Sequence, residues 1–194
     1  MSPTQIAVTI IVIAVLAVLA AAGWMTMRRR SLRQRFGPEY DRVVESEESR
    51  AAAERELRER ERRHAELELR PLSDEARQRY RSGWEEIQAR FVDEPNEAVG
   101  AADELVTKLV AERGYPTADY EEQTAYLSVE HARTLGHYRD AHEINLRNER
   151  GEATTEELRQ ALVHYRALFA DLLGGERPAE PDESRPESSH DARR

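Results

Sequence analysis

Histidine is the residue type in this chain best suited to chemistry, and four of its six copies lie at positions 131, 137, 142 and 164. His142-Glu143 matches the start of a zinc-protease helix, but Leu146 occupies the place of the second histidine. His137 and His142 are separated by about 140° around a helix, so they do not share a metal on one straight helix. We therefore favour packing and helix-end roles for the four histidines over a metal site assembled from them, and expect no metal or other cofactor.

The tripeptide His-Tyr-Arg occurs twice, at residues 137–139 and 164–166. One interpretation is a polar pocket between facing helices, in which Arg139 and Arg166 hold an anionic group. We favour the alternative, in which Tyr138 and Tyr165 belong to apolar helix faces and the residues beside them flank those faces. The candidate ligand or partner contacts from these tripeptides are His137, Tyr138, Arg139, His164 and Arg166.

Tyr115 is a further candidate contact, because it lies in the turn Arg113-Gly114-Tyr115-Pro116. This turn is either an exposed recognition edge or, as we favour, a glycine-capped helix end with its hydrophobic contact.

Motifs of known enzyme classes are absent from the sequence. It contains no cysteine, no glycine-rich phosphate loop, no Gly-x-Ser-x-Gly elbow and no dinucleotide-binding fingerprint. We therefore expect a protein that is not an enzyme and name no catalytic residue.

The N-terminal segment has the composition of a membrane anchor. Residues 6–27 carry no charge, and as a helix they would span about 33 Å, enough for a bilayer core of about 30 Å. Trp24 lies where an interfacial indole belongs. A cleavable signal peptide is the alternative, supported by Ala20-Ala21-Ala22, but residues 1–5 lack the basic side chains of such peptides. The sequence therefore predicts an uncleaved transmembrane helix.

Five arginines follow the apolar run and no basic side chain precedes it. This asymmetry predicts an N-terminus outside the bacterial plasma (inner) membrane and a cytoplasmic C-terminal domain, in a single-pass topology. The predicted lipid contacts are Arg28, Arg29, Arg30, Arg33, Arg35 and Trp24. Each arginine would contribute about 1 kcal/mol against anionic headgroups. We expect no nucleic-acid partner, because the whole chain has a net charge of −9.

The elements that position these residues are all predicted helical. The expected class is all-α, with an N-terminal transmembrane helix, a long charged helix and a small helical bundle. The predicted units are an anchor at 1–27, a basic juxtamembrane linker at 28–38, a charged spacer helix at 39–70, an acidic helical-bundle domain at 71–175 and a disordered tail at 176–194.

The predicted spacer is bounded by Gly37-Pro38 and Pro71. It contains well-oriented acid–base pairs such as Glu56/Arg60, but no apolar heptad persists along it. We therefore predict a solvated single helix of about 48 Å, with a coiled-coil stalk as the alternative.

Residues 71–175 carry apolar stripes at helical spacing, separated by helix-start and helix-stop signals. Ala76, Tyr80, Trp84 and Ile87 form one stripe. Ser73 is a predicted N-cap, Pro95 a first helical residue, and Thr154-x-x-Glu157 a capping box.

The chain resembles a family of small membrane-anchored proteins from high-GC bacterial genomes, usually described only as hypothetical, membrane or secreted proteins. The resembling stretches are residues 35–42, 61–72, 90–93, 113–116, 127–131 and 164–169. The resemblance implies an architecture and carries no mechanism.

Together these features favour a non-catalytic, membrane-tethered interaction or adaptor module that contacts the lipid bilayer and a protein partner. A structural stalk, similar to the anchored peripheral-stalk subunits of rotary ATPases, is a close variant. The alternative from a different class is a small-ligand or metal sensor, or an enzyme, with a His/Tyr/Arg pocket in the bundle.

Overall fold

The computed structural model describes residues 3–174, with side chains for residues 12–13, 15–20 and 22–174. This part of the chain folds into eight helices without a strand, which confirms the predicted all-α class. The helices are α1 (Pro3–Phe36), α2 (Pro38–Ser46), α3 (Arg50–Ala65), α4 (Asp74–Arg90), α5 (Pro95–Glu112), α6 (Tyr120–Glu130), α7 (Ala132–Glu149) and α8 (Thr155–Leu172). The predicted tail at 176–194 lies outside the described residues.

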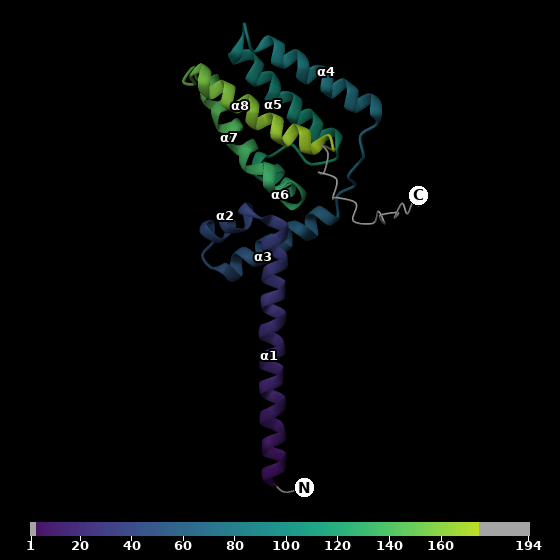
Figure 1. The fold of residues 1–194 in the computed structure, drawn as a ribbon, viewed down its shortest axis with the longest axis vertical. Coiled ribbons are helices and arrows are strands. Elements are labelled where there is room, and N and C mark those ends of the chain that lie inside the picture. The colour runs from purple at the N-terminus through teal and green to yellow at the C-terminus, as the bar shows by residue number, and fades with distance from the viewer. Residues whose placement is uncertain (1–2, 175–194) are drawn as a thin grey trace, which may run out of the picture.

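Helices α4, α5, α7 and α8 form a bundle at one end of the molecule (Figure 1). Its core is lined by the predicted stripes, whose members Ala76, Tyr80, Trp84 and Ile87 are all buried. The predicted helix starts are also confirmed. The Ser73 side chain accepts a hydrogen bond from the Ala76 amide, Pro95 begins α5, and the capping box at the start of α8 is complete.

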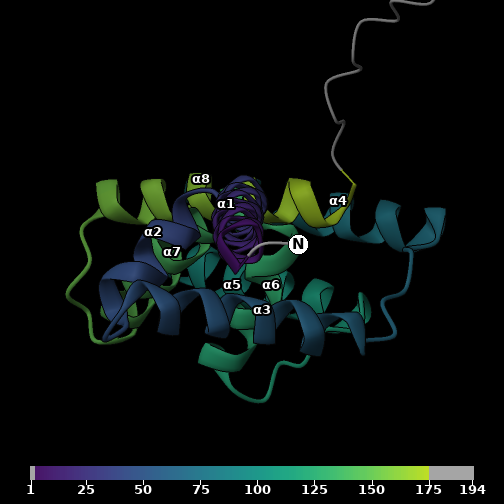
Figure 2. The same ribbon diagram turned by 90° about the horizontal axis from the view of Figure 1, so that it is seen from below.

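Helix α1 projects away from the bundle as a single rod (Figure 1), and the view from below looks nearly along it (Figure 2). It runs through the predicted boundary at residue 27 and ends at Phe36. Gly37, at φ +46°, and Pro38 then turn the chain into α2, as the sequence predicts. Among the described residues, none of the helices combines the length and apolar character needed to cross a bilayer. The predicted anchor includes positions 6–11, 14 and 21, whose side chains are not described.

The prediction of one solvated helix over residues 39–70 is wrong. The segment forms two helices, α2 and α3, which pack against each other and against α1, α6 and α7. Ser49 caps the start of α3 by accepting a hydrogen bond from the Ala52 amide at 3.2 Å. The buried apolar residues of this small second core are Leu32, Phe36, Tyr40, Val43, Ala53, Leu57 and Val129. The sequence analysis inferred exposure to solvent from the lack of a continuous apolar heptad. Two short packed helices need only a few apolar positions each, so they can bury one face without such a heptad.

The chain after α3 is hydrogen-bonded to the end of α5. The Arg70 amide donates a hydrogen bond to the Arg113 carbonyl at 2.9 Å. Gly114 adopts φ +97°, and a Cβ at this position would lie 2.8 Å from the Glu68 carbonyl oxygen. Both the backbone conformation and the close approach therefore require glycine here.

Candidate functional site

Three of the five predicted lipid-contacting arginines form ion pairs within the chain. Arg29 lies 3.2 Å from Glu54, Arg33 lies 3.0 Å from Asp41, and Arg35 lies 3.3 Å from Glu61. All three acids belong to α2 or α3, so these pairs join the end of α1 to the helical hairpin.

The other predicted lipid contacts are exposed on α1. The guanidinium of Arg28 lies 4.1 Å from the ring centre of Trp24, a cation–π contact that orients the exposed indole. Arg30 is also exposed. Lipid contact by these residues and by Arg29, Arg33 and Arg35 stays a prediction.

A buried carboxylate connects the hairpin to the bundle. Glu39 of α2 is 4% exposed and accepts hydrogen bonds from Arg139 of α7 at 2.8 Å and from Arg60 of α3 at 3.1 Å. A second nitrogen of Arg139 contacts the other oxygen of Glu39, so this pair is bidentate. Glu39 therefore links three helices through one side chain. It is absent from the sequence-based candidates, because nothing local to it identifies a partner a hundred residues away.

The two His-Tyr-Arg tripeptides lie opposite each other on α7 and α8, with their tyrosines inward. The rings of Tyr138 and Tyr165 are buried and meet edge to face at 6.1 Å. Tyr138 donates a hydrogen bond to Gln123, and Tyr165 donates one to Asp103 at 2.7 Å. Burial raises the pKa of both phenols well above its usual value.

Asp103 organises a polar cluster inside the bundle. Its Oδ1 atom also lies 3.2 Å from Nδ1 of His142, whose ring stacks on Tyr120 at 4.2 Å. Burial, partly offset by the charge of Arg139, raises the pKa of Tyr120 to about 12. Asp103 is therefore the hydrogen-bond partner of both Tyr165 and His142, as interior polar side chains require.

The burial of Tyr138 and Tyr165 agrees with the favoured interpretation, and the alternative, an anion pocket between Arg139 and Arg166, is not formed. Arg139 of α7 is bound to Glu39. Arg166 of α8 instead lines a groove of about 290 Å³ between α4 and α8. The stacked rings of Trp84 and Phe169 form the floor of this groove. The two arginines diverge because residues one position after the inward-facing tyrosines lie on different sides of the α7–α8 pair.

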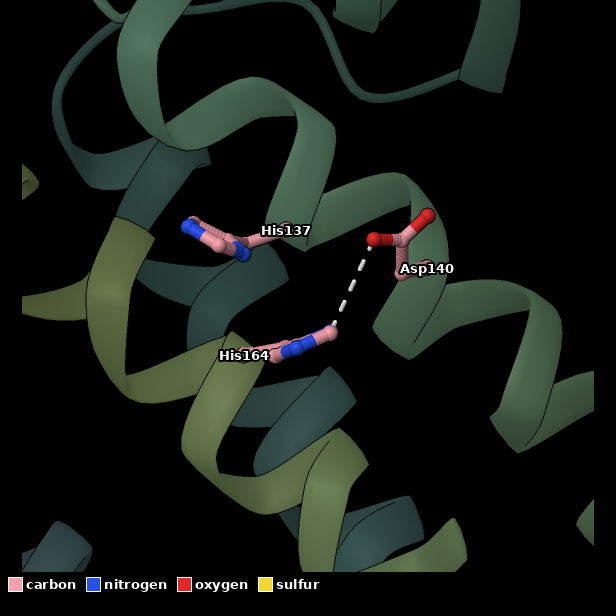
Figure 3. Close-up of side chains that lie close together, drawn as sticks. All are labelled: His137, Asp140 and His164. Carbon is pink, nitrogen blue, oxygen red and sulfur yellow. Dashed lines mark ion pairs between the residues drawn. The ribbon is translucent and has the colours of Figure 1, made fainter.

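The histidines of the tripeptides do converge. His137 and His164 have ring centres 4.9 Å apart, and Asp140 lies beside them, 3.8 Å from Nδ1 of His164 (Figure 3). One ligand atom from each of these three residues lies within 4.8 Å of the other two. This is the group in the described part of the chain that can hold a metal ion. Sequence reasoning missed Asp140, although its position three residues after His137 puts both on one helix face.

Tyr115 is buried rather than exposed, so the turn after α5 is a helix cap and not a recognition edge. Its hydroxyl donates to Glu130 at 3.3 Å and lies 3.4 Å from Nε2 of His131. Nδ1 of His131 in turn lies 2.8 Å from Asp171, at the end of α8. Burial raises the pKa of the Tyr115 phenol. For Asp171, burial alone would raise the pKa, but hydrogen bonding and charge from His131 outweigh it and lower the pKa.

A polar cleft of about 850 Å³ opens beside this network, between the last turns of α1 and the junction of α6 and α7. Its lining residues are Gln34, Arg35, Val129, Glu130, His131, Ala132, Arg133, Asp171 and Gly174. Both signs of charge are present, so the cleft suits a polar ligand that carries both donor and acceptor groups. Spacing in the sequence gives no sign of it, because α1, α6, α7 and α8 all contribute.

Neither a protein-family model, nor a curated protein, nor a solved structure matches the chain.

Proposed function

We propose that this protein is a single-pass, membrane-anchored and non-catalytic interaction module. Residues 6–27 are the anchor, the N-terminus lies outside the bacterial plasma membrane, and the helical domain lies in the cytoplasm. The apolar composition of the run and the arginines on one side of it support this topology.

The observation that carries the proposal is the continuity of α1. The helix extends from Pro3 to Phe36 without a break, and its last turns bury Leu32 and Phe36 in the domain. Ion pairs from Arg29, Arg33 and Arg35 fix the same turns to α2 and α3. An anchor joined in this way holds the domain directly at the bilayer surface, in place of the long reach that a solvated spacer would give.

The domain's charge indicates the kind of partner. Residues 71–175 carry a net charge of −9, which favours a partner with a basic surface and speeds its encounter with the domain. Five of the described tyrosines, Tyr40, Tyr80, Tyr115, Tyr138 and Tyr165, donate hydrogen bonds to acid or amide side chains, and this supports structural roles for them over catalysis.

Reporter fusions after Gly175 test the topology. A cytoplasmic fluorescent reporter is expected to be bright, and an alkaline phosphatase, which is active only in the periplasm, is expected to be inactive. The reverse pattern would place the domain outside and contradict the proposal. Crosslinking in cells, followed by identification of the captured proteins, then tests for a partner with a basic surface.

Binding of a small polar ligand is a second candidate function, favoured by the cleft beside His131. Its convergent charged groups are those expected of a ligand site. A thermal-shift screen of small zwitterionic and anionic compounds tests it with the full chain. A stabilising compound is expected to lose its effect in Arg133→Ala, whose side chain is exposed, and to keep it in Arg159→Ala, which lies away from the cleft.

A further inference from the structure

His137, Asp140 and His164 form a ligand set on the outer face of the α7–α8 hairpin. His137 and Asp140 are exposed and His164 is half-buried, so the group lies at the surface of the domain. Two imidazole nitrogens and one carboxylate oxygen are a donor set that Zn²⁺ and related first-row ions prefer, whereas Mg²⁺ and Ca²⁺ prefer oxygen alone. We propose that these three residues bind one divalent transition-metal ion and thereby tie α7 to α8.

The distances require only a small contraction. Ligand atoms around tetrahedral Zn²⁺ lie about 3.3 Å apart, given Zn–N bonds of about 2.0–2.1 Å. The candidate ligand atoms here are within 4.8 Å of one another. The exposed side chains of His137 and Asp140 can close the difference by rotation about their own bonds, without displacing a helix.

The hydrogen bonding of His164 is a second observation that supports this group. In the described part of the chain, His131 and His142 have aspartate oxygens at 2.8 Å and 3.2 Å, respectively. Nδ1 of His164 and Nε2 of His64 are instead buried without a hydrogen-bond partner within those residues, and of the two only His164 lies in a group of metal-ligating side chains. A buried ring nitrogen without a partner is costly, and a metal ion would satisfy it.

Three protein ligands leave at least one coordination position open. Such a site accepts a water molecule or a side chain from another protein in the fourth position.

Calorimetric titration of the full chain in detergent with Zn²⁺ tests the proposal. We expect saturable binding of one ion per chain and a higher melting temperature in its presence. His164→Gln should weaken binding at least tenfold, since even changes outside the metal ligands cost about 10–100-fold. His142→Gln is the matched control, because it removes a histidine of the same helix pair that lies outside the ligand set, and it should bind as the original protein does.

His137→Gln repeats the test at an exposed position that does not affect folding. Circular dichroism of each variant confirms that the helices are retained. Co²⁺ provides a second measurement, because coordination by the two histidines should produce a visible absorption band that both ligand variants lose. Absence of saturable Zn²⁺ binding, or equal binding by the original protein and His137→Gln, would overturn the proposal.

Discussion

The bundle of α4, α5, α7 and α8 is held by a large apolar core, whereas the α2–α3 hairpin combines a small apolar core with buried and half-buried charges. Apolar burial has no direction and tolerates small shifts in packing. The Glu39 contacts depend on both partners being present and correctly placed. The two regions should therefore fail in different ways when single residues are removed.

The largest effect is expected in the bundle core. Phe169 is 4% exposed and stacks on Trp84 at 4.8 Å. Phe169→Ala should lower the free energy of unfolding by about 3–5 kcal/mol, because it leaves a cavity that the core cannot fill. Urea titration followed by circular dichroism measures the loss. Val163→Ala, at a 55% exposed position of the same helix, should change stability by no more than about 0.5 kcal/mol.

A somewhat smaller and local effect is expected at the junction of the two regions. Glu39→Ala should lower the free energy of unfolding by about 3 kcal/mol. This is the lower end of the range for breaking a buried ion pair, because Arg60 and Arg139 retain some access to water. Hydrogen exchange should show faster exchange in α2 and α3 and unchanged protection in the bundle.

Asp41→Ala removes an exposed carboxylate from the same helix and is the control for Glu39→Ala. Its pair with Arg33 is exposed to solvent and should contribute little to stability. Equal exchange in the two variants would show that Glu39 does not hold the junction.

The smallest effect is expected from pH at His64 of α3. Burial, together with the nearby charges of Arg35 and His131, lowers the pKa of His64 against the opposing influence of Glu130. The folded state therefore favours neutral His64, while the unfolded chain takes up a proton below pH of about 6.5. Stability should be full above that pH and fall as the pH drops towards the lowered pKa of the folded state.

Unfolding measured at pH 7.5 and pH 5.5 tests this pH dependence. His64→Gln should reduce the difference between the two values. A difference that His64→Gln leaves unchanged would assign the pH dependence to other groups.

Apolar periodicity and capping residues were sufficient to predict the bundle, since each stripe and cap is encoded within one helix. The hairpin was not predictable in this way. Glu39 has many arginines as potential partners, and nothing in their spacing distinguishes Arg139 from the others. At the candidate metal site of His137, Asp140 and His164, the repeated tripeptide was visible in the sequence. Which of its side chains lie close together depends on the rotation of α7 relative to α8, and this rotation cannot be read from the sequence.

If residues 6–27 anchor the chain, as we propose, the unbroken α1 gives the domain a defined helical phase relative to the membrane. Each residue of an α-helix turns the chain by about 100° and advances it by about 1.5 Å. One alanine inserted between Met27 and Leu32 would therefore swing every surface of the domain around the anchor by more than a quarter turn, with almost no change in height. A pair of residues would point the domain to the opposite side. A partner in the same bilayer would then meet a different face. Under the proposed topology, the number of residues between the anchor and Leu32 therefore sets the direction in which the domain faces.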